Sequence, residues 1–286
     1  MYPSDRMEKA IIGLDIGASL TKVVLVDENL RIIGYEILPS GDPRGTALKA
    51  LECLFKAIGP AYRENAGVIV ATGGGSRFLG DKVLGIPLTW INEIKAIGLG
   101  GSTLSGMGDC LVVSAGTGTA LVIVREDGKI IRHIGGTGVG GGTILGLSWR
   151  LLRVLDFRAL EKMALRGDPN KVDLTVGDLI GGPIGILPAD VTASNFGKIL
   201  GEPSPEDIAA GIFNMVSQTI GVVSSMAAKA YGLEDKVIIT GMLAKSKLFS
   251  KIIYETTKLF SVNIYIPENC ELASAIGAIA AYLRGN

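Results

Sequence analysis

The sequence predicts an α/β protein built from two related domains, each opening with strands joined by a glycine-rich turn. Between Ala10 and Leu38, apolar and β-branched runs alternate with short turns, a pattern typical of three consecutive strands. Strand, glycine turn and strand recur from Asp109 to Asp127. Glycine is also abundant, with 40 of 286 residues, about twice the usual share. This content indicates backbone that turns tightly or approaches a ligand.

The first domain reads as a βββαβ unit. Its opening strands, within 10–38, are expected to be antiparallel because short turns connect them. A buried strand over 67–72 runs into the glycine loop Gly73–Gly75. Between them, a helix is predicted over Thr46–Ala61, where apolar residues recur at helical spacing: Leu48, Leu51, Leu54, Phe55 and Ile58.

The second domain repeats the strands and then becomes mainly helical. A third strand over 129–134 leads into the densest glycine run of the chain, and helical patterns fill Thr143–Arg166. A long helix is predicted over Ser204–Tyr231, with Ser204 as N-cap and Gly232 after its end. The chain closes with a strand over 237–240, a helix over Lys245–Phe260, a strand over 262–266 and a helix over Glu271–Leu283.

The predicted domains are residues 1–98 and 99–286. No linker-like or low-complexity segment separates them, so the chain is expected to cross tightly between the domains near 98–108. The closing helix, 271–284, is expected to pack near this hinge.

Composition and charge favour small-molecule chemistry in the cytoplasm. Because 28 basic residues balance 28 acidic residues, no nucleic-acid or membrane partner is expected. The cysteines, Cys53, Cys110 and Cys270, are odd in number and far apart, which favours neither a disulfide framework nor a metal site. Asp15 follows the first apolar stretch too soon for a signal peptide, and the apolar run over 272–283 is too short to span a bilayer.

The first glycine turn carries the polar groups that a phosphate site needs. A lone glycine turn between strands is usually only a hairpin. Here Asp15 ends a buried strand, and Ser19, Thr21 and Lys22 follow within a few residues. Backbone N–H groups of such a turn can wrap a polyphosphate while the carboxylate orients Mg²⁺ through its waters. Asp15 is therefore the predicted metal-side residue.

A second turn and a third loop add to this site. Gly116–Thr119 repeats the turn in the other domain, and two facing turns would grip the β- and γ-phosphates of a nucleotide from both sides. Gly135–Thr143 leads into a helix whose free N–H groups would attract an anion. The sequence contains no Walker A motif, and the first glycine turn joins two strands, unlike a dinucleotide fingerprint.

Together these segments resemble a known superfamily. Four of them are similar to sugar kinases, heat-shock ATPases and actin: DIGASLTK (15–22), GTGT (116–119), VIITG (237–241) and ELASAIGAIAAYL (271–283). Four others resemble type II pantothenate kinases: TGGG (72–75), NEIKA (92–96), GGTGVGGGTILGL (135–147) and DVTASNFGK (190–198). The resemblance runs from about Ala10 to Leu283. It implies the two-domain actin-like ATPase (ribonuclease H-like) fold, with βββαβα units, mixed sheets and a cleft between the domains.

The resemblance also implies a function and a set of site residues. The function is ATP- and Mg²⁺-dependent phosphorylation of the primary hydroxyl of pantothenate, the first step of coenzyme A biosynthesis, by a homodimer. Glu93 matches the general base. The implied ATP-binding residues are Asp15, Ile16, Gly17, Ala18, Ser19, Leu20, Thr21, Lys22, Thr117, Gly118, Thr119, Gly141, Gly142, Thr143, Ile144, Leu145, Phe157, Gly241 and Met242. The implied substrate-binding residues are Arg132, His133, Gly136 and Thr137.

Helical periodicity places Glu93 independently of the resemblance. The segment 89–100 reads as a helix with Ile91, Ile94 and Ile97 inward. Glu93 would then point away from that apolar face, toward solvent or a cleft. The alternative for Glu93 is a solvent-exposed helical glutamate without a catalytic role. The alternative for Phe157 is a residue of the core.

Three positions depart from the family pattern. Ala120 replaces a serine after GTGT, and Met242 replaces a serine after Gly241. His133, the one histidine of the chain, stands where the family has an arginine that contacts pantothenate, and Arg132 precedes it. Strand alternation directs Arg132 and His133 to opposite faces, so either one could take that role.

Two other functions and one structural alternative stay open. A kinase of the same fold could act on a sugar or another pantothenate-like alcohol. An ATPase switch could instead drive a partner protein, although activators of the iron–sulfur type use cysteines at a subunit interface and none is paired near these loops. In the helix over Ser204–Tyr231, the small and apolar stretch 222–230 fits helix packing in a homodimer, or equally an internal core helix.

Overall fold

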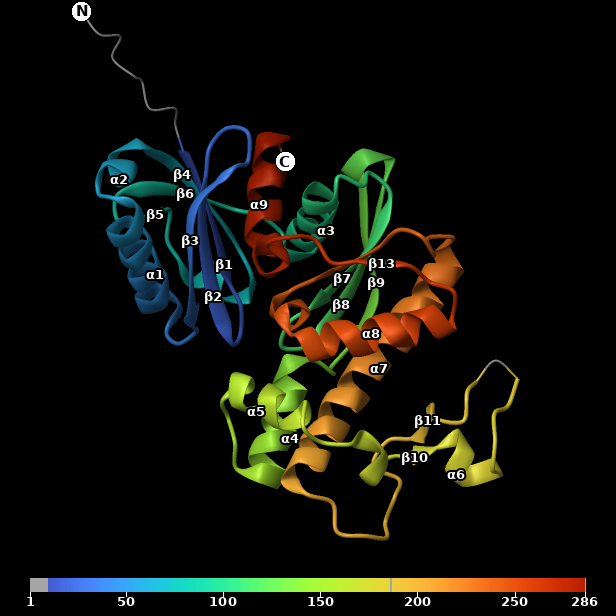
Figure 1. Cartoon of the computed structure of the whole chain (residues 1–286). Helices are drawn as coiled ribbons and strands as arrows, with labels where there is room; N and C mark the ends of the chain where they lie inside the picture. The colour runs from blue at the N-terminus through green and yellow to red at the C-terminus, as the bar shows by residue number, and fades with distance from the viewer. Residues whose placement is uncertain (1–9, 186, 286) are drawn as a thin grey trace, which may run out of the picture. The chain divides into compact units, whose positions relative to one another are not determined.

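The computed structural model describes residues 10–185 and 187–285 (Figure 1). Their contacts form two compact units, each assembled from separate stretches of chain. Unit 1 comprises residues up to 112, 122–134 and from 267 onward; unit 2 comprises 113–121 and 135–266. The predicted boundary between residues 98 and 99 lies inside helix α3 (Glu93–Ser105), which belongs wholly to unit 1. The units are interleaved along the chain, a pattern that a single boundary does not describe.

Unit 1 contains a six-stranded mixed sheet with the order β3-β2-β1-β4-β6-β5. The first three strands are antiparallel, as predicted, and β1, β4 and β6 run parallel. β5 pairs antiparallel with β6 at the edge. The strands are β1 (Ala10–Ile16), β2 (Leu20–Val26), β3 (Ile32–Pro39), β4 (Ala66–Thr72), β5 (Lys82–Val83) and β6 (Ile86–Trp90).

Helices cover both faces of this sheet (Figure 1). Helix α1 (Pro43–Ile58) packs on one face, where it forms an apolar core with Ile12 and Leu14 of β1. Helices α3 and α9 (Ala273–Leu283) form a second core on the other face, with Ile11 of β1. Alternate residues of β1 therefore enter opposite cores, as expected for a central strand. The short helix α2 (Ala61–Asn65) follows α1.

Two helices of unit 1 begin at other residues than the sequence predicts, each next to a capping residue. Helix α1 begins earlier than predicted because the Asp42 carboxylate accepts the Gly45 N–H at 2.7 Å and Pro43 occupies the first turn. The helix predicted from residue 89 begins only at Glu93, because residues 89–90 end β6. Asn92 caps it, with Oδ1 accepting the N–H groups of Ile94 at 3.0 Å and Lys95 at 3.3 Å.

Unit 2 is built on a five-stranded sheet with the order β13-β12-β7-β8-β9, in which β7, β8 and β9 contribute residues to both units. The repeated strand–glycine turn–strand module is therefore confirmed, as is the predicted α/β fold class with mixed sheets. The strands are β7 (Cys110–Ala115), β8 (Thr119–Arg125), β9 (Ile130–Thr137), β12 (Val237–Thr240) and β13 (Ile264–Tyr265), and a separate pair is formed by β10 (Leu174–Thr175) and β11 (Thr192–Ser194).

The helices of unit 2 follow the predicted pattern with one break. The segment predicted as helical over Thr143–Arg166 divides in two, because Arg153 has a left-handed backbone (φ 60°) and Asp156 caps a new helix. The long helix has the predicted N-cap, with Ser204 Oγ accepting the Asp207 N–H at 3.2 Å. The helices are α4 (Gly141–Leu152), α5 (Phe157–Ala164), α6 (Val176–Ile180), α7 (Pro205–Tyr231) and α8 (Lys247–Leu259).

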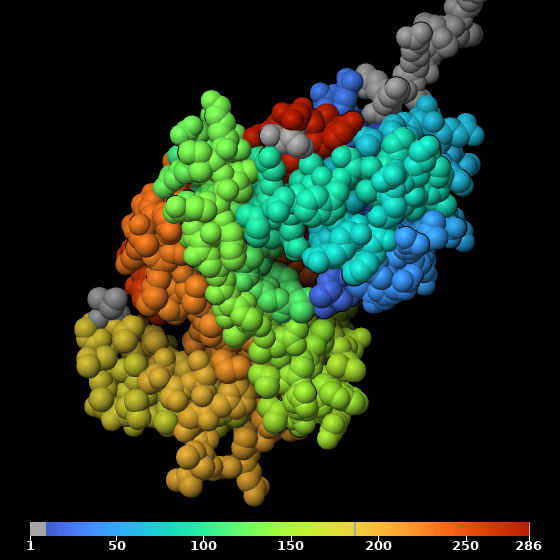
Figure 2. Space-filling model, turned by 180° about the vertical axis from the view of Figure 1, so that it is seen from behind, coloured from blue at the N-terminus to red at the C-terminus, as the bar shows by residue number. Residues whose placement is uncertain are grey.

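Helix α7 is a core helix of unit 2. Phe213, Val216 and Ile220 are fully buried, which supports the internal alternative for this helix. Among the helices that the structure describes, it is the one with the length and apolar composition of a membrane span, but 67% of its most apolar window is buried within the protein. The segment before α7, gold in Figure 2, projects from unit 2 and exposes Ile199 and Leu200, at 92% and 87%.

Candidate functional site

The turn between β1 and β2 places an ion pair at the end of the central strand of unit 1. The antiparallel register sets Asp15 directly opposite Lys22, and Lys22 Nζ donates to Asp15 Oδ2 at 3.1 Å. The side chain of Asp15 is only 8% exposed and that of Lys22 only 13%. Water therefore screens this pair less than an ordinary surface pair.

The hydroxyl of Thr21 supports the turn from inside. Thr21 is fully buried, and its Oγ1 lies 2.9 Å from Ser40 Oγ, which donates to the Gly17 carbonyl at 2.7 Å. Ala18 and Ser19 are exposed at the tip of the turn. Ile16 is buried, so its backbone, not its side chain, is the part that can face a ligand.

A glycine loop closes over Asp15 from the neighbouring strand. β4 runs parallel to β1 with Thr72 as the register partner of Asp15, and Gly73 follows with φ 83°. A Cβ at Gly73 would lie 2.7 Å from Asp15 Oδ1 and 2.6 Å from the Ile16 carbonyl. Because both contacts are too short for a side chain, this position requires glycine. Thr72 Oγ1 is buried here and has no hydrogen-bond partner within the described residues.

Glu93 lies in a pocket of about 510 Å³ within unit 1. It is the first residue of α3 and is exposed to solvent, yet protein covers part of its side chain. This partial desolvation raises the pKa of Glu93, the negative charge of Asp15 raises it further, and Lys22 and Arg77 oppose the shift. The residues lining the pocket are Gly73, Gly74, Arg77, Trp90, Asn92, Glu93 and Ile94.

Unit 1 therefore brings the predicted base into electrostatic contact with the predicted metal-side pair. A carboxylate with a raised pKa is a stronger base than an ordinary glutamate. Glu93 can accept a proton from a hydroxyl group in this pocket, while Lys22 supplies positive charge. Ile91 and Ile97 are buried and Ile94 is half-buried, so the predicted inward face is largely confirmed.

In unit 2 the second glycine turn is closed by the loop that follows β9. Gly141 N–H donates to the Gly116 carbonyl at 2.8 Å, and Gly142 N–H donates to the Thr117 carbonyl at 2.9 Å. Thr119 Oγ1 donates to the Val139 carbonyl at 2.9 Å. The turn and the loop thus form one hydrogen-bonded cradle, with Thr117 exposed at its surface.

The expectation of free N–H groups at the start of α4 is wrong. Besides Gly141 and Gly142, the N–H groups of Thr143 and Ile144 are bonded, both to the Gly140 carbonyl, at 3.0 and 3.2 Å. For Gly141 and Gly142 the reason is the close approach of the loop to the turn, where a Cβ at Gly140 would lie 2.6 Å from the Thr117 carbonyl. The glycines of this loop serve backbone packing in this structure.

The other predicted nucleotide residues of unit 2 lie in mainly structural surroundings. Phe157 is half-buried, with its ring edge-on to Phe213 at 5.5 Å between centroids, an arrangement that suits the core alternative. Gly241 is buried against the backbone of Ala115. Met242, Leu145 and Gly118 are all half-buried.

The predicted acceptor residues lie along β9. Arg132 and His133 are exposed and belong to unit 1, while Gly136 and Thr137 belong to unit 2. Neither Arg132 nor His133 lines the pocket that contains Glu93. Thr137 Oγ1 accepts the Val139 N–H at 3.2 Å.

Sequence reasoning missed two residues of the Glu93 pocket. Trp90 is 54% exposed, and its Nε1 donates to Ser76 Oγ at 2.7 Å. Arg77 lies in the 3₁₀ segment Gly74–Phe78, and its Nε donates to the Gly74 carbonyl at 2.9 Å. The signal that could have found Arg77 is its position two residues after the glycines of TGGG.

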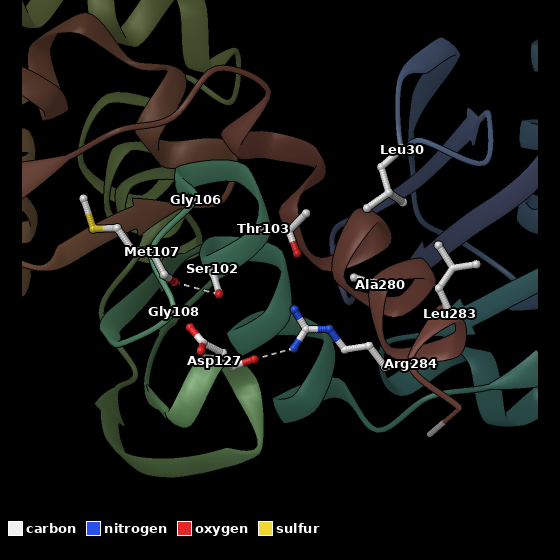
Figure 3. A pocket seen from close by; sticks show the side chains of 10 residues that line it. All are labelled: Leu30, Ser102, Thr103, Gly106, Met107, Gly108, Asp127, Ala280, Leu283 and Arg284. Atoms are coloured by element: carbon white, nitrogen blue, oxygen red, sulfur yellow. Dashed lines mark hydrogen bonds between the residues drawn. The ribbon is translucent and has the colours of Figure 1, made fainter.

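A second pocket of unit 1, of about 370 Å³, contains none of the predicted residues (Figure 3). Within it Arg284 Nη1 donates to the Asp127 carbonyl at 2.7 Å, and Ser102 Oγ donates to the Met107 carbonyl at 2.7 Å. These two hydrogen bonds fix the residue that follows α9 and the residues that follow α3, so both groups have structural roles. Its lining is Leu30, Ser102, Thr103, Gly106, Met107, Gly108, Asp127, Ala280, Leu283 and Arg284.

The residues near Asp15 fit a Mg²⁺ ion that is coordinated mostly by water and substrate phosphates. The described residues contain no group of three or more His, Cys, Asp or Glu side chains that could hold a metal ion. A single carboxylate, beside the unpartnered hydroxyl of Thr72, matches the way Mg²⁺ binds through one or two carboxylates, waters and substrate phosphates.

Comparison with known proteins agrees with the family that the sequence motifs resemble. The Fumble family model matches residues 102–265, more than half of the chain. The type II pantothenate kinase of Staphylococcus aureus strain USA300 is 28% identical over 277 residues, covering 94% of this chain and 98% of that protein.

Solved structures share the fold at lower identity. The activator of the 2-hydroxyisocaproyl-CoA dehydratase from Clostridium difficile, with bound ADPNP, aligns with a TM-score of 0.71 and 19% identity over 96% of this chain and 95% of that one. A ROK family glucokinase from Streptomyces griseus, in complex with glucose and AMPPNP, aligns with a TM-score of 0.58 and 13% identity over 95% and 98%. These likenesses confirm the predicted fold, and the family match confirms a phosphotransferase: the chain belongs to the Fumble family, that of the type II pantothenate kinases.

Proposed function

We propose that this protein is an ATP-dependent kinase that phosphorylates the primary hydroxyl of pantothenate, the first step of coenzyme A biosynthesis. The observation that carries the proposal is the pocket of unit 1, where the charges of Asp15 and Lys22 act on the pKa of Glu93. The family membership and the S. aureus relative support the choice of acceptor.

In this mechanism Glu93 is the general base. Its carboxylate accepts the proton of the acceptor hydroxyl as the hydroxyl oxygen forms a bond to the γ-phosphorus. The bond between that phosphorus and the β–γ bridging oxygen breaks, and ADP leaves. Phosphoryl transfer asks a protein mainly for positioning and electrostatic stabilisation. Glycine loops, one lysine and one carboxylate base are sufficient for those tasks.

The two glycine turns are proposed to bind the nucleotide. In unit 1, Lys22 would stabilise negative charge on the transferred group, and the backbone at the exposed tip of the turn, Ala18 and Ser19, would face the phosphates. The Gly17 N–H already donates to the Leu20 carbonyl at 3.1 Å. In unit 2, the cradle of Gly116–Thr119 and Gly140–Leu145 would hold the nucleotide mainly by shape, because most of its N–H groups near α4 are already bonded. Phe157 and Gly241-Met242 are kept as adenosine-side candidates.

The carboxylate of Asp15 would hold Mg²⁺, through water molecules. When bound, Mg²⁺ would supply positive charge to the β- and γ-phosphates. Asp15 also fixes the direction of the Lys22 ammonium through the 3.1 Å hydrogen bond. The β9 residues Arg132, His133, Gly136 and Thr137 are kept as candidates for contacts to the acceptor.

A homodimer in the cytoplasm completes the proposal. Its support is the family resemblance and the exposed apolar side chains of unit 2, including Met226 on α7, Ile199 and Leu200. Light scattering at micromolar concentration tests the dimer, and a monomer mass would contradict it.

A coupled ATP-consumption assay tests the function. The purified protein is offered pantothenate, pantetheine and several hexoses, with Mg²⁺ present or replaced by a chelator. Turnover that is fastest with pantothenate and depends on Mg²⁺ is expected. Faster turnover of a neutral alcohol or a hexose would keep the kinase and replace the acceptor.

The second candidate is an ATPase switch that acts on a partner protein. The fold likeness to the dehydratase activator favours keeping it, since its TM-score exceeds that of the glucokinase. ATP hydrolysis that appears only when a protein partner is added, with no alcohol phosphorylated, would support the switch over the kinase.

A further inference from the structure

The geometry points to Arg77 as the residue that binds the carboxylate of the acceptor, an inference that rests on the proposed function. The acceptor would place its hydroxyl at Glu93 and its carboxylate at Arg77, at two points of the same pocket. No family motif gave Arg77 a role, and the candidates from the resemblance, Arg132 and His133, lie outside this lining.

The guanidinium of Arg77 is held in place through Nε, and its terminal nitrogens can bind a ligand. Nε donates to the Gly74 carbonyl at 2.9 Å, which fixes the direction of the side chain. No carboxylate in the described part of the chain pairs with it. A guanidinium with one N–H anchored retains donors for a planar anion, which it can bind in a bidentate manner.

The pocket wall near Arg77 includes an aromatic side chain held by hydrogen bonds. The Trp90 indole N–H donates to Ser76 Oγ, and Ser76 Oγ donates to the Gly73 carbonyl, each at 2.7 Å. This chain of hydrogen bonds ties an exposed aromatic ring to the glycine loop that closes over Asp15. A large exposed aromatic side chain held in place is typical of a ligand contact. Pantothenate has a branched apolar carbon next to its primary hydroxyl, and such a group would pack against the exposed ring of Trp90.

Charge separation within the pocket fits an acceptor of this type. Glu93 and Asp15 are both acidic and lie close enough for the charge of Asp15 to affect Glu93. A carboxylate brought near them would be repelled unless a cation were provided. Arg77 is the cation of the pocket lining, and its charge also acts on Glu93. A carboxylate-bearing alcohol is therefore favoured in one orientation, with its carboxylate at Arg77 and its hydroxyl at Glu93.

The other anion that Arg77 could bind is the transferred phosphate of ATP. The two sources predict different kinetics. A carboxylate contact affects only acceptors that carry a carboxylate, mainly through KM. A phosphate contact affects every acceptor alike, mainly through kcat.

The test compares Arg77→Gln, Arg77→Lys and the control Arg44→Gln with pantothenate and with pantetheine, which lacks the carboxylate. Arg44 is a matched control because its Nε also donates to a backbone carbonyl of the same segment, that of Phe78 at 2.8 Å, from outside the pocket. In Arg77→Gln we expect KM for pantothenate to rise roughly 10- to 100-fold, with kcat and both constants for pantetheine little changed. Arg77→Lys should show a smaller rise, and Arg44→Gln none.

Three results would overturn the inference. The first is an equal fall in kcat for both acceptors, which assigns Arg77 to the phosphate. The second is an unchanged KM for pantothenate in Arg77→Gln. The third is a larger rise in KM from Arg132→Ala or His133→Ala than from Arg77→Gln. Thermal midpoints of all variants identify any loss of fold.

Calorimetry separates this inference from the proposed function. If the wild type turns over no alcohol but binds pantothenate, the kinase proposal fails while Arg77 is still tested by the affinity of Arg77→Gln. Weaker pantothenate binding in that variant, with binding in Arg44→Gln unchanged, would support the carboxylate contact. Absence of pantothenate binding to the wild type would overturn both.

Discussion

The two glycine turns of this protein share a strand–turn–strand setting but differ in what they present. The turn of unit 1 is flanked by the sheltered pair Asp15–Lys22, and the charges of this pair act on Glu93. The turn of unit 2, Gly116–Thr119, carries no charged residue, and its carbonyls are occupied by the N–H groups of Gly141 and Gly142. In the proposed mechanism the two copies of the motif therefore have different roles: unit 1 would supply charge and a base, and unit 2 would supply a shaped backbone cradle.

The largest expected effect is on the base in unit 1. Glu93→Gln should lower kcat by roughly 10²–10⁴, the usual contribution of a general base, because the amide cannot accept the hydroxyl proton. ATP affinity and fold should be preserved. Steady-state kinetics and calorimetry check this, with Glu52→Gln, an exposed glutamate of α1, as control. A variant that keeps most of its kcat rules out the base role.

The raised pKa of Glu93 adds two directional expectations. As a base, Glu93 must be ionised, so kcat/KM should fall as pH is lowered through a pKa above the ordinary value of about 4.5. A carboxyl whose pKa is raised by folding holds its proton more tightly in the folded state, so its ionisation above that pKa opposes folding. Glu93→Gln should therefore have an unchanged or higher thermal midpoint at pH 7, and a marked fall would contradict this account.

The next effect is on the ion pair. Asp15→Asn should leave the sheltered Lys22 ammonium without its counter-charge and lower the free energy of unfolding by about 3 kcal/mol, measured by urea denaturation. The same variant should weaken ATP binding more with Mg²⁺ than without it. Glu255→Gln is the control, because its pair with Lys251 is 4.0 Å long and exposed and is worth less than about 0.5 kcal/mol. Equal ATP affinity in Asp15→Asn and wild type would remove Asp15 from the metal side.

A smaller effect is expected from the cradle of unit 2. Gly140→Ala would place a Cβ 2.6 Å from the Thr117 carbonyl and 2.8 Å from Gly118 Cα, forcing the loop away from the turn. Such overpacking costs about 1–3 kcal/mol and should raise KM for ATP without changing the pH profile. Gly146→Ala is the matched control, because it lies within α4 with open space around it and should stabilise by about 0.5–1 kcal/mol. Equal stabilities of the two variants would show that the cradle is not tightly packed.

Much of the fold could be predicted because the sequence carries local signals for it. The strands of 10–38 show their β-branched runs, and Ser204, Asp207 and Gly232 mark the ends of α7. The predictions were wrong where a capping side chain or a left-handed backbone, neither visible in the apolar pattern, decided the boundary. Asn92 moved the start of α3, and the left-handed Arg153 divided α4 from α5.

The site was less accessible to sequence reasoning because it depends on tertiary packing. The pattern could place Glu93 off an apolar face, but not in a pocket with Arg77 and Trp90, which come from different segments. Likewise, the glycines of 135–142 indicated close backbone approach without saying to what. The partner is the turn Gly116–Thr119, whose carbonyls accept the N–H groups of Gly141 and Gly142 that were expected to bind an anion.

The smallest expected effect compares the hydroxyls that support the two turns. In unit 1 the buried Thr21 hydroxyl meets Ser40, which can still donate to the Gly17 carbonyl if Thr21 is lost. In unit 2, Thr119 Oγ1 donates to the Val139 carbonyl from a site only slightly exposed, and that contact connects turn and loop. Thr119→Val should therefore lower the free energy of unfolding by about 1 kcal/mol and raise KM for ATP slightly. Thr21→Val should cost no more stability than that and should leave KM for ATP unchanged. Urea denaturation and ATP titrations of the two variants check the difference. A larger KM effect from Thr21→Val would mean that the unit 1 turn, not the unit 2 cradle, depends on its threonine to hold the nucleotide.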